Sequence, residues 1–197
     1  MRIPLILPSL FIGMLLQCCA QPIPNLENQI GAAVLAAPEE HRADATVLGY
    51  DAAGNILTLR EGTNNFICLA DNPNLEGFNV ACYHKNLEPF MARGRALKAE
   101  GKSGGEIFEI REKEAKEGTL NMPEQAATLY VYSGKDAQYD PETGEAAGAN
   151  LRYVVYIPWA TPETSGLPLK PQVPGGPWIM DPGTHRAHIM ISPPPKK

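Results

Sequence analysis

The chain is poor in cysteine, in positive charge and in long apolar runs, and each shortage excludes a class of protein. Only four cysteines occur among 197 residues, too few for a small scaffold held together by many disulfides. Lysine and arginine number 17 against 22 acidic residues, which gives a net charge of −5. A nucleic-acid-binding surface needs a basic excess, so we expect no nucleic-acid partner.

Glycine and proline are abundant by contrast. The chain holds 18 glycines and 19 prolines, which predicts many turns and loops. Ten of those prolines crowd into residues 158–197. Apolar residues make up 44% of the chain, which is enough to bury a core and excludes global disorder.

The first twenty residues have the layout of a secretory signal peptide. Arg2 supplies a positive start, residues 3–16 are almost wholly apolar, and small residues lead to Ala20. A run of about 14 apolar residues is shorter than the ~20 that a membrane helix needs. We expect cleavage after Ala20, export to the periplasm or the cell exterior, and no transmembrane helix in what remains.

A lipid anchor is the alternative to soluble export. Residues 15–18 (Leu-Leu-Gln-Cys) resemble a bacterial lipobox, although Gln17 stands where a small residue is usual. Cys18 or Cys19 would then carry the lipid and tie the protein to the cell envelope. Both alternatives place the folded chain outside the cytoplasm.

Two cysteines remain after the signal segment, Cys68 and Cys82. An oxidising compartment favours their pairing, and no metal-type Cys-x-x-Cys spacing occurs near them. The disulfide would close a loop of about 15 residues and contribute ~3 kcal/mol in the chain-entropy model.

The pattern of the chain predicts an α+β fold with a mainly antiparallel β core. Residues 21–44 form an N-terminal linker and a short helix, and residues 45–192 form a single α+β domain. A helical hairpin, residues 86–117, is inserted in that domain. A proline-rich C-terminal segment follows the core, and residues 193–197 are a Pro/Lys tail.

Short runs rich in β-branched and aromatic residues predict the strands. They are residues 45–50, 56–60, 66–69, 128–132, 152–157, 178–180 and 188–191. Residues 152–157 form the most apolar run, so we expect a central strand covered on both faces. Residues 134–150 are expected to be a surface excursion, and residues 162–177 an extended loop.

Two helices are predicted within the hairpin. Leu87, Phe90 and Leu97 recur at helical spacing and indicate a first amphipathic helix. Ser103 stands three residues before Glu106, which is the spacing of a capping box at the start of a second helix. The mixed charges of this segment are typical of a solvated helix face.

Histidines are the main candidates for chemistry. His185 and His188 have a spacing seen in metal pairs, and His84 could supply a third ligand. On a strand, however, residues three apart point to opposite faces, which weakens chelation. The chain contains no Gly-x-Ser-x-Gly and no phosphate-binding loop, and we expect no cofactor.

Aromatic and histidine side chains are the candidates for ligand binding. The candidate binding residues are Tyr83, His84, Trp178 and His188. Tyr130 and Tyr132 share a strand face and, with Trp159 and Trp178, could line a sugar-binding surface. We expect any site to lie beneath the proline-rich segment.

Four stretches together resemble a family of uncharacterised exported bacterial proteins. They are residues 59–64, 82–84, 88–95 and 176–191, and the similarity extends over most of residues 45–192. The resemblance implies export and carries no activity. The family pattern has Pro and an aromatic residue where this chain has His185 and Arg186, so His188 is the better candidate for a shared role.

Export and the lack of a catalytic motif lead to one expected function. The chain is expected to be a non-catalytic binding or envelope-associated module that contacts a small molecule or an envelope component. The alternative is a metal-dependent or general acid/base hydrolase that uses His84, His185 and His188.

Overall fold

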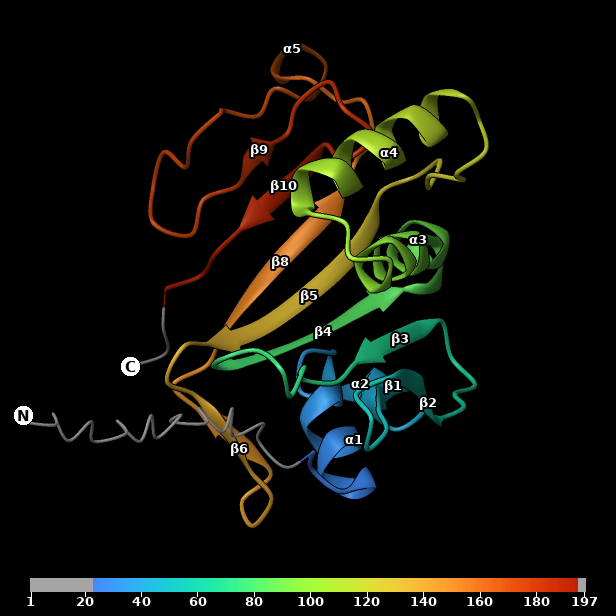
Figure 1. The fold of residues 1–197 in the computed structure, drawn as a ribbon. Helices are drawn as coiled ribbons and strands as arrows, with labels where there is room; N and C mark the ends of the chain where they lie inside the picture. The colour runs from blue at the N-terminus through green and yellow to red at the C-terminus, as the bar shows by residue number, and fades with distance from the viewer. Residues whose placement is uncertain (1–22, 195–197) are drawn as a thin grey trace, which may run out of the picture.

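The computed structural model describes residues 23–194. The expected signal peptide, with Cys18 and Cys19, lies outside the described residues. The described chain has an α+β fold built around one eight-stranded sheet with the order β2-β1-β3-β4-β5-β8-β10-β9 (Figure 1). Neighbouring strands are antiparallel except β1 and β3, which are parallel. The predicted fold class is therefore confirmed.

The strands of the main sheet are β1 (Thr46–Tyr50), β2 (Ile56–Arg60), β3 (Phe66–Leu69), β4 (Phe78–His84), β5 (Ala127–Gly134), β8 (Asn150–Tyr156), β9 (Trp178–Met180) and β10 (His188–Ile191). A small separate hairpin is formed by β6 (Gln138–Asp140) and β7 (Glu145–Ala147). The helices are α1 (Leu26–Val34), α2 (Glu39–Arg42), the 3-10 turn η1 (Lys85–Leu87), α3 (Glu88–Ala99), α4 (Gly104–Lys116) and α5 (Pro162–Ser165).

Strand register assigns alternate residues to the two faces of the sheet. Cys82 of β4 pairs with Cys68 of β3 and with Tyr130 of β5, whereas its neighbour Tyr83 pairs with Leu129. Successive strand residues point to opposite faces. The sheet thus has an α1 face, which carries Cys82, and an α3 face, which carries Tyr83.

Helix α1 covers the α1 face over the first strands of the sheet. Its buried side chains are small, as in Ala32 and Ala33, so the helix packs close to the strands. Gln29 is also buried, and its amide satisfies the backbone of Tyr50: it accepts from the N–H at 2.8 Å and donates to the C=O at 3.0 Å.

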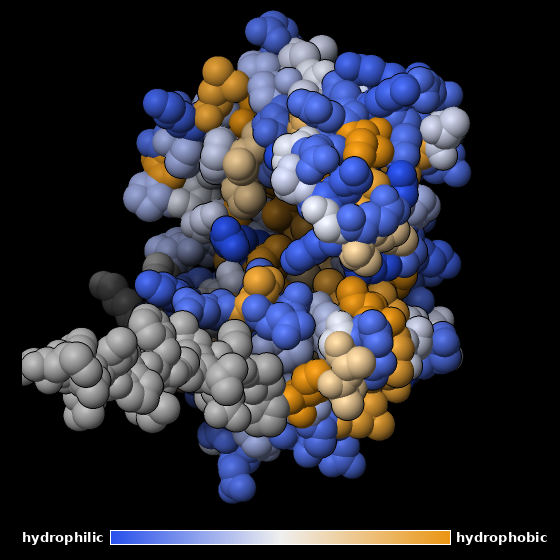
Figure 2. Space-filling model, in the orientation of Figure 1, coloured by the Kyte–Doolittle hydropathy of each residue, from blue (hydrophilic) through white to orange (hydrophobic). Residues whose placement is uncertain are grey.

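Helix α3 packs on the other face of the sheet. Leu87 and Phe90 are buried with Leu129 and Val154 of the central strands. Helix α4 lies beside α3, and Figure 2 shows mostly hydrophilic residues over α4 and apolar ones at the floor of the hollow between it and the strands. The predicted capping box is present, with Ser103 N–H donating to the Glu106 carboxylate at 2.9 Å. Among residues 23–194, the structure contains no helix of the length and apolarity that crossing a bilayer requires.

Two strands of the main sheet differ from the sequence prediction. Strand β4 was not expected, because Asn79 and the turn before it interrupt the apolar run. Strand β8 is not covered on both faces: Val154 and Tyr156 on its α3 face are buried, whereas Leu151, Tyr153 and Val155 on the other face are only half-buried. The described helices near this strand lie on its α3 face, so only that face needs apolar residues.

The excursion over residues 134–150 is partly a core element. Its β6–β7 hairpin buries Ala137 and Ala146 against the α1-face core. Tyr132 donates from its hydroxyl to the Ala146 carbonyl at 3.2 Å and anchors the hairpin. The residues from 162 onward likewise contain a short helix, α5, rather than extended chain throughout.

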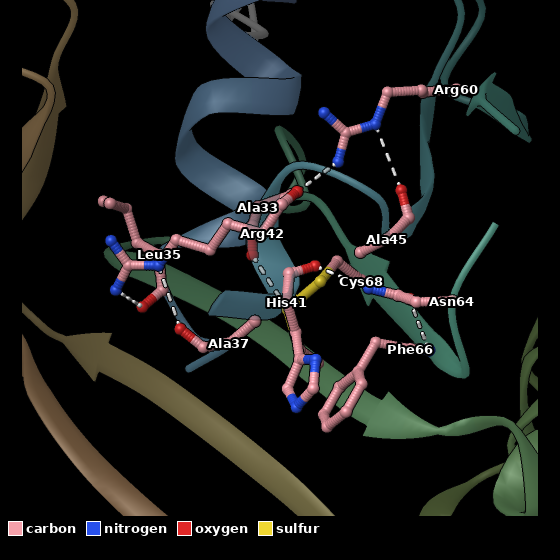
Figure 3. Close-up of a disulfide and its surroundings, with 11 residues drawn as sticks. Ala33, Leu35, Ala37, His41, Arg42, Ala45, Arg60, Asn64, Phe66 and Cys68 are labelled. Atoms are coloured by element: carbon pink, nitrogen blue, oxygen red, sulfur yellow. Dashed lines mark hydrogen bonds between the residues drawn. A yellow bond between two sulfur atoms is a disulfide. The ribbon is translucent and has the colours of Figure 1, made fainter. Parts of the chain in front are cut away.

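Cys68 and Cys82 form the predicted disulfide. The two residues face each other across β3 and β4, with Cα atoms 4.0 Å apart. Both are fully buried, and the Cys82 sulfur lies 3.2 Å from the Ala33 carbonyl oxygen of α1. Figure 3 shows Cys68 beneath α1, where Arg42 and Arg60 tie the neighbouring segments to backbone carbonyls.

Candidate functional site

The structure does not bring the three candidate histidines together. His84 lies at the end of β4, where its Nδ1 accepts from the Asn86 N–H at 3.2 Å and its ring meets Phe66 edge to face. His185 and His188 lie in and after the loop between β9 and β10, on the α3 face. Within residues 23–194, no group of three or more His, Cys, Asp or Glu side chains is placed to hold a metal ion.

The candidate binding residues are likewise separated. Tyr83 is fully buried, and its hydroxyl donates to Glu88 at 2.6 Å and accepts from Arg95 at 2.9 Å. Burial raises the pKa of this phenol, so it stays protonated. Trp178 is half-buried on β9 and pairs with Met190 of β10, two residues beyond His188. Trp178 and His188 therefore share the α3 face. These side chains do not form one pocket.

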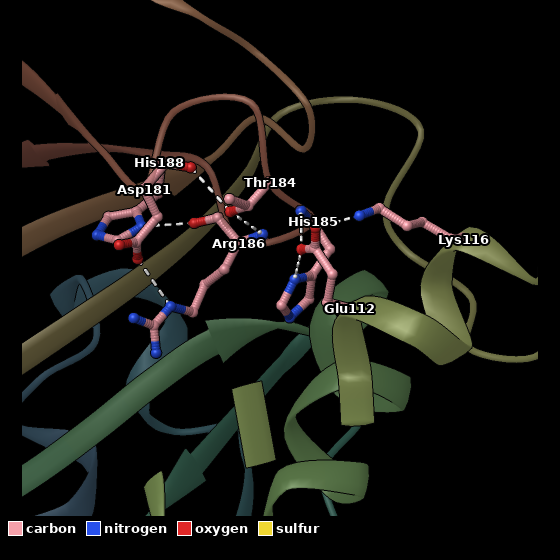
Figure 4. A network of polar contacts seen from close by, with 7 residues as sticks. All are labelled: Glu112, Lys116, Asp181, Thr184, His185, Arg186 and His188. Carbon is pink, nitrogen blue, oxygen red and sulfur yellow. Dashed lines mark hydrogen bonds and ion pairs between the residues drawn. The ribbon is translucent and has the colours of Figure 1, made fainter. Parts of the chain in front are cut away.

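Glu112 of α4 holds the loop that carries His185 (Figure 4). One carboxylate oxygen, Oε2, accepts from the His185 backbone N–H at 3.1 Å and lies 2.6 Å from the ring Nδ1. The other oxygen pairs with Lys116 at 2.7 Å. The side chain of His185 is 0% exposed, so this contact fixes both the loop backbone and the ring.

The charges at this contact follow from its surroundings. Burial opposes ionisation of Glu112, but hydrogen bonds from Lys116 and His185 outweigh it and lower its pKa to about 2. Burial lowers the pKa of His185 despite the nearby carboxylate. We therefore assign an ionised Glu112 and a neutral His185 whose Nδ1 carries the proton.

Two buried atoms near this contact have no hydrogen-bond partner among the described residues. They are Nε2 of His185 and Nε of Arg111. Both side chains lie against Phe90: the Arg111 guanidinium is 3.9 Å from the ring centroid, and the His185 ring is 5.8 Å away. Burial also lowers the pKa of Arg111 to about 10. Unpartnered buried polar groups are costly, so this region is not optimised for stability alone.

The same loop positions His188 and Arg186. The Arg186 Nε donates to Asp181 at 2.8 Å, and its carbonyl lies 2.7 Å from His188 Nδ1 (Figure 4). Burial lowers the pKa of His188, so its ring is neutral near pH 7. Asp181 has a positive φ of 49°, which marks a tight turn stabilised by these contacts.

Trp159 has an unusual backbone conformation. It has a φ of 68°, in the left-handed region that favours glycine. The conformation is held by its own N–H, which donates to the Thr184 carbonyl at 2.8 Å, and by the Gly183 N–H, which donates to Ala160 at 2.8 Å. The side chain is nevertheless 40% exposed. The fold keeps a strained backbone that presents an indole ring to solvent.

The Trp159 ring borders a cleft of about 390 Å³, which we call the Trp159 cleft. Its walls are Met122, Pro123, Glu124, Gln125, Ala126, Ile157, Pro158, Trp159 and Ala160. A second hollow of about 420 Å³ runs along α4 from Phe108 to Lys116 and Glu117. The Lys116 ammonium, which borders this second hollow, lies 6.0 Å from the Trp159 ring centroid.

Sequence reasoning found some of these residues and missed others. Trp159 was considered only with the strand aromatics, although two prolines, Pro158 and Pro162, flank it and mark an unusual turn. Glu112 was assigned to a solvated helix face, because no sequence signal links it to His185, 73 residues away. The Trp159 cleft lies at the start of the proline-rich segment, and the expectation of a site beneath that segment stays a prediction.

Chemically, the region combines a buried neutral imidazole with an open, aromatic-walled cleft. The imidazole is held by Glu112, and the cleft has one carboxylate and one amide on its wall, from Glu124 and Gln125. In comparisons with known proteins, no family model matches the chain, and neither a curated protein nor a solved structure does.

Proposed function

We propose that the protein is an exported, non-catalytic binding module and that the Trp159 cleft is its ligand site. The observation that carries this proposal is an exposed tryptophan held at positive φ beside a 390 Å³ cleft. Strain of this kind costs of order 1–3 kcal/mol and persists where the surrounding structure enforces it for a purpose. An exposed ring adds little to the core, so ligand contact accounts for it best.

The location of His185 supports binding rather than catalysis. A general base must come within hydrogen-bonding distance of the proton it removes. The ring of His185 is 0% exposed and is enclosed by Phe90 and Phe108, with centroids 5.8 and 5.0 Å away. The ring therefore supports the loop that carries Thr184, and through it Trp159, instead of meeting a substrate.

Ligand binding is tested with probes of three classes: neutral oligosaccharides, a ten-residue proline peptide and anionic phospholipid vesicles. We expect one class to bind the purified protein and to lose its affinity for a Trp159→Gly variant that remains folded. Turnover of a bound probe would contradict the non-catalytic assignment. Binding that is unchanged in the variant, or no binding by any class, would contradict the site.

Export is tested separately in cells. The N-terminal sequence of the mature protein is expected to begin at Gln21 if Ala20 precedes the cleavage site. Palmitate labelling and sensitivity to globomycin would instead indicate a lipid on Cys18 or Cys19. A protein recovered from the cytoplasm with Met1 intact would contradict both routes.

A further inference from the structure

We infer that the Trp159 cleft binds a neutral oligosaccharide through one of its sugar rings. The inference rests on the proposed function and adds the chemical class of the ligand. It follows from three features of the described residues: the type of side chain on each wall of the cleft, the charges around it, and the size of the cleft.

The walls of the cleft suit a molecule with an apolar face and a polar rim. Trp159 gives a flat apolar surface, and the half-buried Pro158 beside it extends this surface with a rigid ring. Glu124 and Gln125 are both exposed on the same cleft. A pyranose ring presents C–H groups on its faces and hydroxyls at its edge, so the indole can take the face while carboxylate and amide bond the hydroxyls.

The charges disfavour an anionic ligand. Glu124 is the charged side chain among the residues that line the Trp159 cleft. The nearest cation described beside Trp159, Lys116, already pairs with Glu112 at 2.7 Å. An anionic sugar or lipid headgroup would be repelled by Glu124, since the nearby Lys116 is already paired. A neutral hydroxylated ligand can instead donate hydrogen bonds to this carboxylate.

The cleft also has the size of a small-ligand site. Its volume of about 390 Å³ falls in the range of ~300–1,000 Å³ common for such sites. Because the Trp159 side chain is 40% exposed, a chain of sugars can extend into solvent beyond the ring that stacks on the indole.

The test is isothermal titration of the purified protein with tetrasaccharides of matched length. The neutral probes are chitotetraose, cellotetraose and maltotetraose, and the acidic probe is tetragalacturonate. A ten-residue proline peptide and anionic vesicles represent the other ligand classes. We expect a neutral tetrasaccharide to bind and tetragalacturonate to bind at least about tenfold more weakly.

Variants locate the bound sugar. Trp159→Gly should weaken binding by more than about tenfold, and Glu124→Gln and Gln125→Ala by about three- to tenfold each, as expected for one lost stacking surface or hydrogen bond. The matched control is Leu169→Ala, which truncates another exposed apolar side chain on the proline-rich segment, 57% exposed and outside the Trp159 cleft. It should bind like the parent protein.

The outcomes separate this inference from the proposed function. A neutral tetrasaccharide that requires Trp159 supports both. Binding of the peptide, the vesicles or the acidic sugar at Trp159, without neutral sugars, overturns the inference and leaves the binding function standing. No binding by any probe, or sugar binding indifferent to Trp159→Gly, overturns both.

Discussion

The two faces of the sheet differ in how their buried polar groups are paired. The α1-face core contains small apolar side chains and a disulfide, and its buried polar residue, Gln29, bonds its neighbours through both amide atoms. The α3-face region contains an arginine and a histidine with unpartnered buried atoms. It also supports a tryptophan at positive φ. The buried polar side chain of the α1 face is paired, whereas the unpartnered buried atoms and the strained tryptophan are gathered on and beside the α3 face.

We propose that this contrast separates structural residues from functional ones. A core that only stabilises the fold has no reason to keep unsatisfied polar atoms, strained backbone or an exposed indole. Those features lie together around α4 and the loops that carry Trp159 and His185. The comparison predicts that substitutions in the core change the free energy of unfolding, whereas substitution of Trp159 changes it little. The following experiments test this in order of decreasing effect on stability.

The largest loss of stability is expected from Phe90→Ala. Phe90 is 1% exposed, packs on Tyr156 with ring centroids 5.3 Å apart, and lies under the Arg111 cation. Truncation should lower the free energy of unfolding by about 3–5 kcal/mol, measured by urea denaturation. The control, Met91→Ala at a half-buried neighbouring position, should lose about 1 kcal/mol. Equal losses would show that Phe90 is not central to this core.

Removing the disulfide should have the next largest effect. The double variant Cys68→Ala/Cys82→Ala frees a loop whose ends are 14 residues apart. We expect a loss of about 2–4 kcal/mol in thermal or guanidinium unfolding. Dithiothreitol should destabilise the parent protein by a similar amount and leave the double variant unchanged. A parent protein indifferent to the reductant would contradict the pairing.

Acid should weaken the α3-face region. The pKa of Glu112 in the folded protein is about 2, below its ordinary value, so its stabilisation is present above about pH 4.5 and lost as the pH falls toward 2. The pKa values of His185 and His188 are also lowered, so folding resists their protonation and stability begins to fall below about pH 6.5.

Urea denaturation between pH 7 and pH 3 measures this dependence. As the pH falls below 4.5, the parent protein should lose about 1–3 kcal/mol of stability through protonation of Glu112, with allowance for the solvent contact of this carboxylate. The Glu112→Gln variant should lack this part of the loss. Glu109→Gln, on the same helix, is the matched control because the structure gives it no contact with His185. Identical pH profiles for the parent and Glu112→Gln would contradict the assigned hydrogen bond between ionised Glu112 and neutral His185.

Trp159 should contribute least to stability. Glycine adopts positive φ without strain, so Trp159→Gly should change the free energy of unfolding by no more than about 1 kcal/mol. Trp159→Ala keeps the strain and should be less stable than the glycine variant by about 1–2 kcal/mol. A large loss in Trp159→Gly would mean that the ring is a structural element.

The sequence allowed local features to be predicted better than long-range ones. The disulfide, the helical hairpin and the Ser103 capping box depend on spacing within a short segment or on the only remaining cysteine pair. Strand β4 was missed because Asn79 breaks its pattern. The contact between Glu112 and His185 joins residues 73 positions apart, and only the folded chain shows it.

The candidate site shows the same limit. Trp159 was visible as one of two tryptophans, but its backbone conformation depends on the Thr184 carbonyl, which belongs to another loop. His84 was grouped with His185 and His188 by residue type alone. Alternation along β4 and the order of the strands place it on the opposite face.

The most direct test uses the fact that the chain has two tryptophans. In Trp178→Phe, fluorescence reports on Trp159 alone, and in Trp159→Phe it reports on Trp178. Titration with a neutral tetrasaccharide should shift the emission of Trp159 and protect it from acrylamide quenching, while Trp178 stays unchanged. A ligand-dependent change at Trp178 with none at Trp159 would contradict the Trp159 cleft as the binding site.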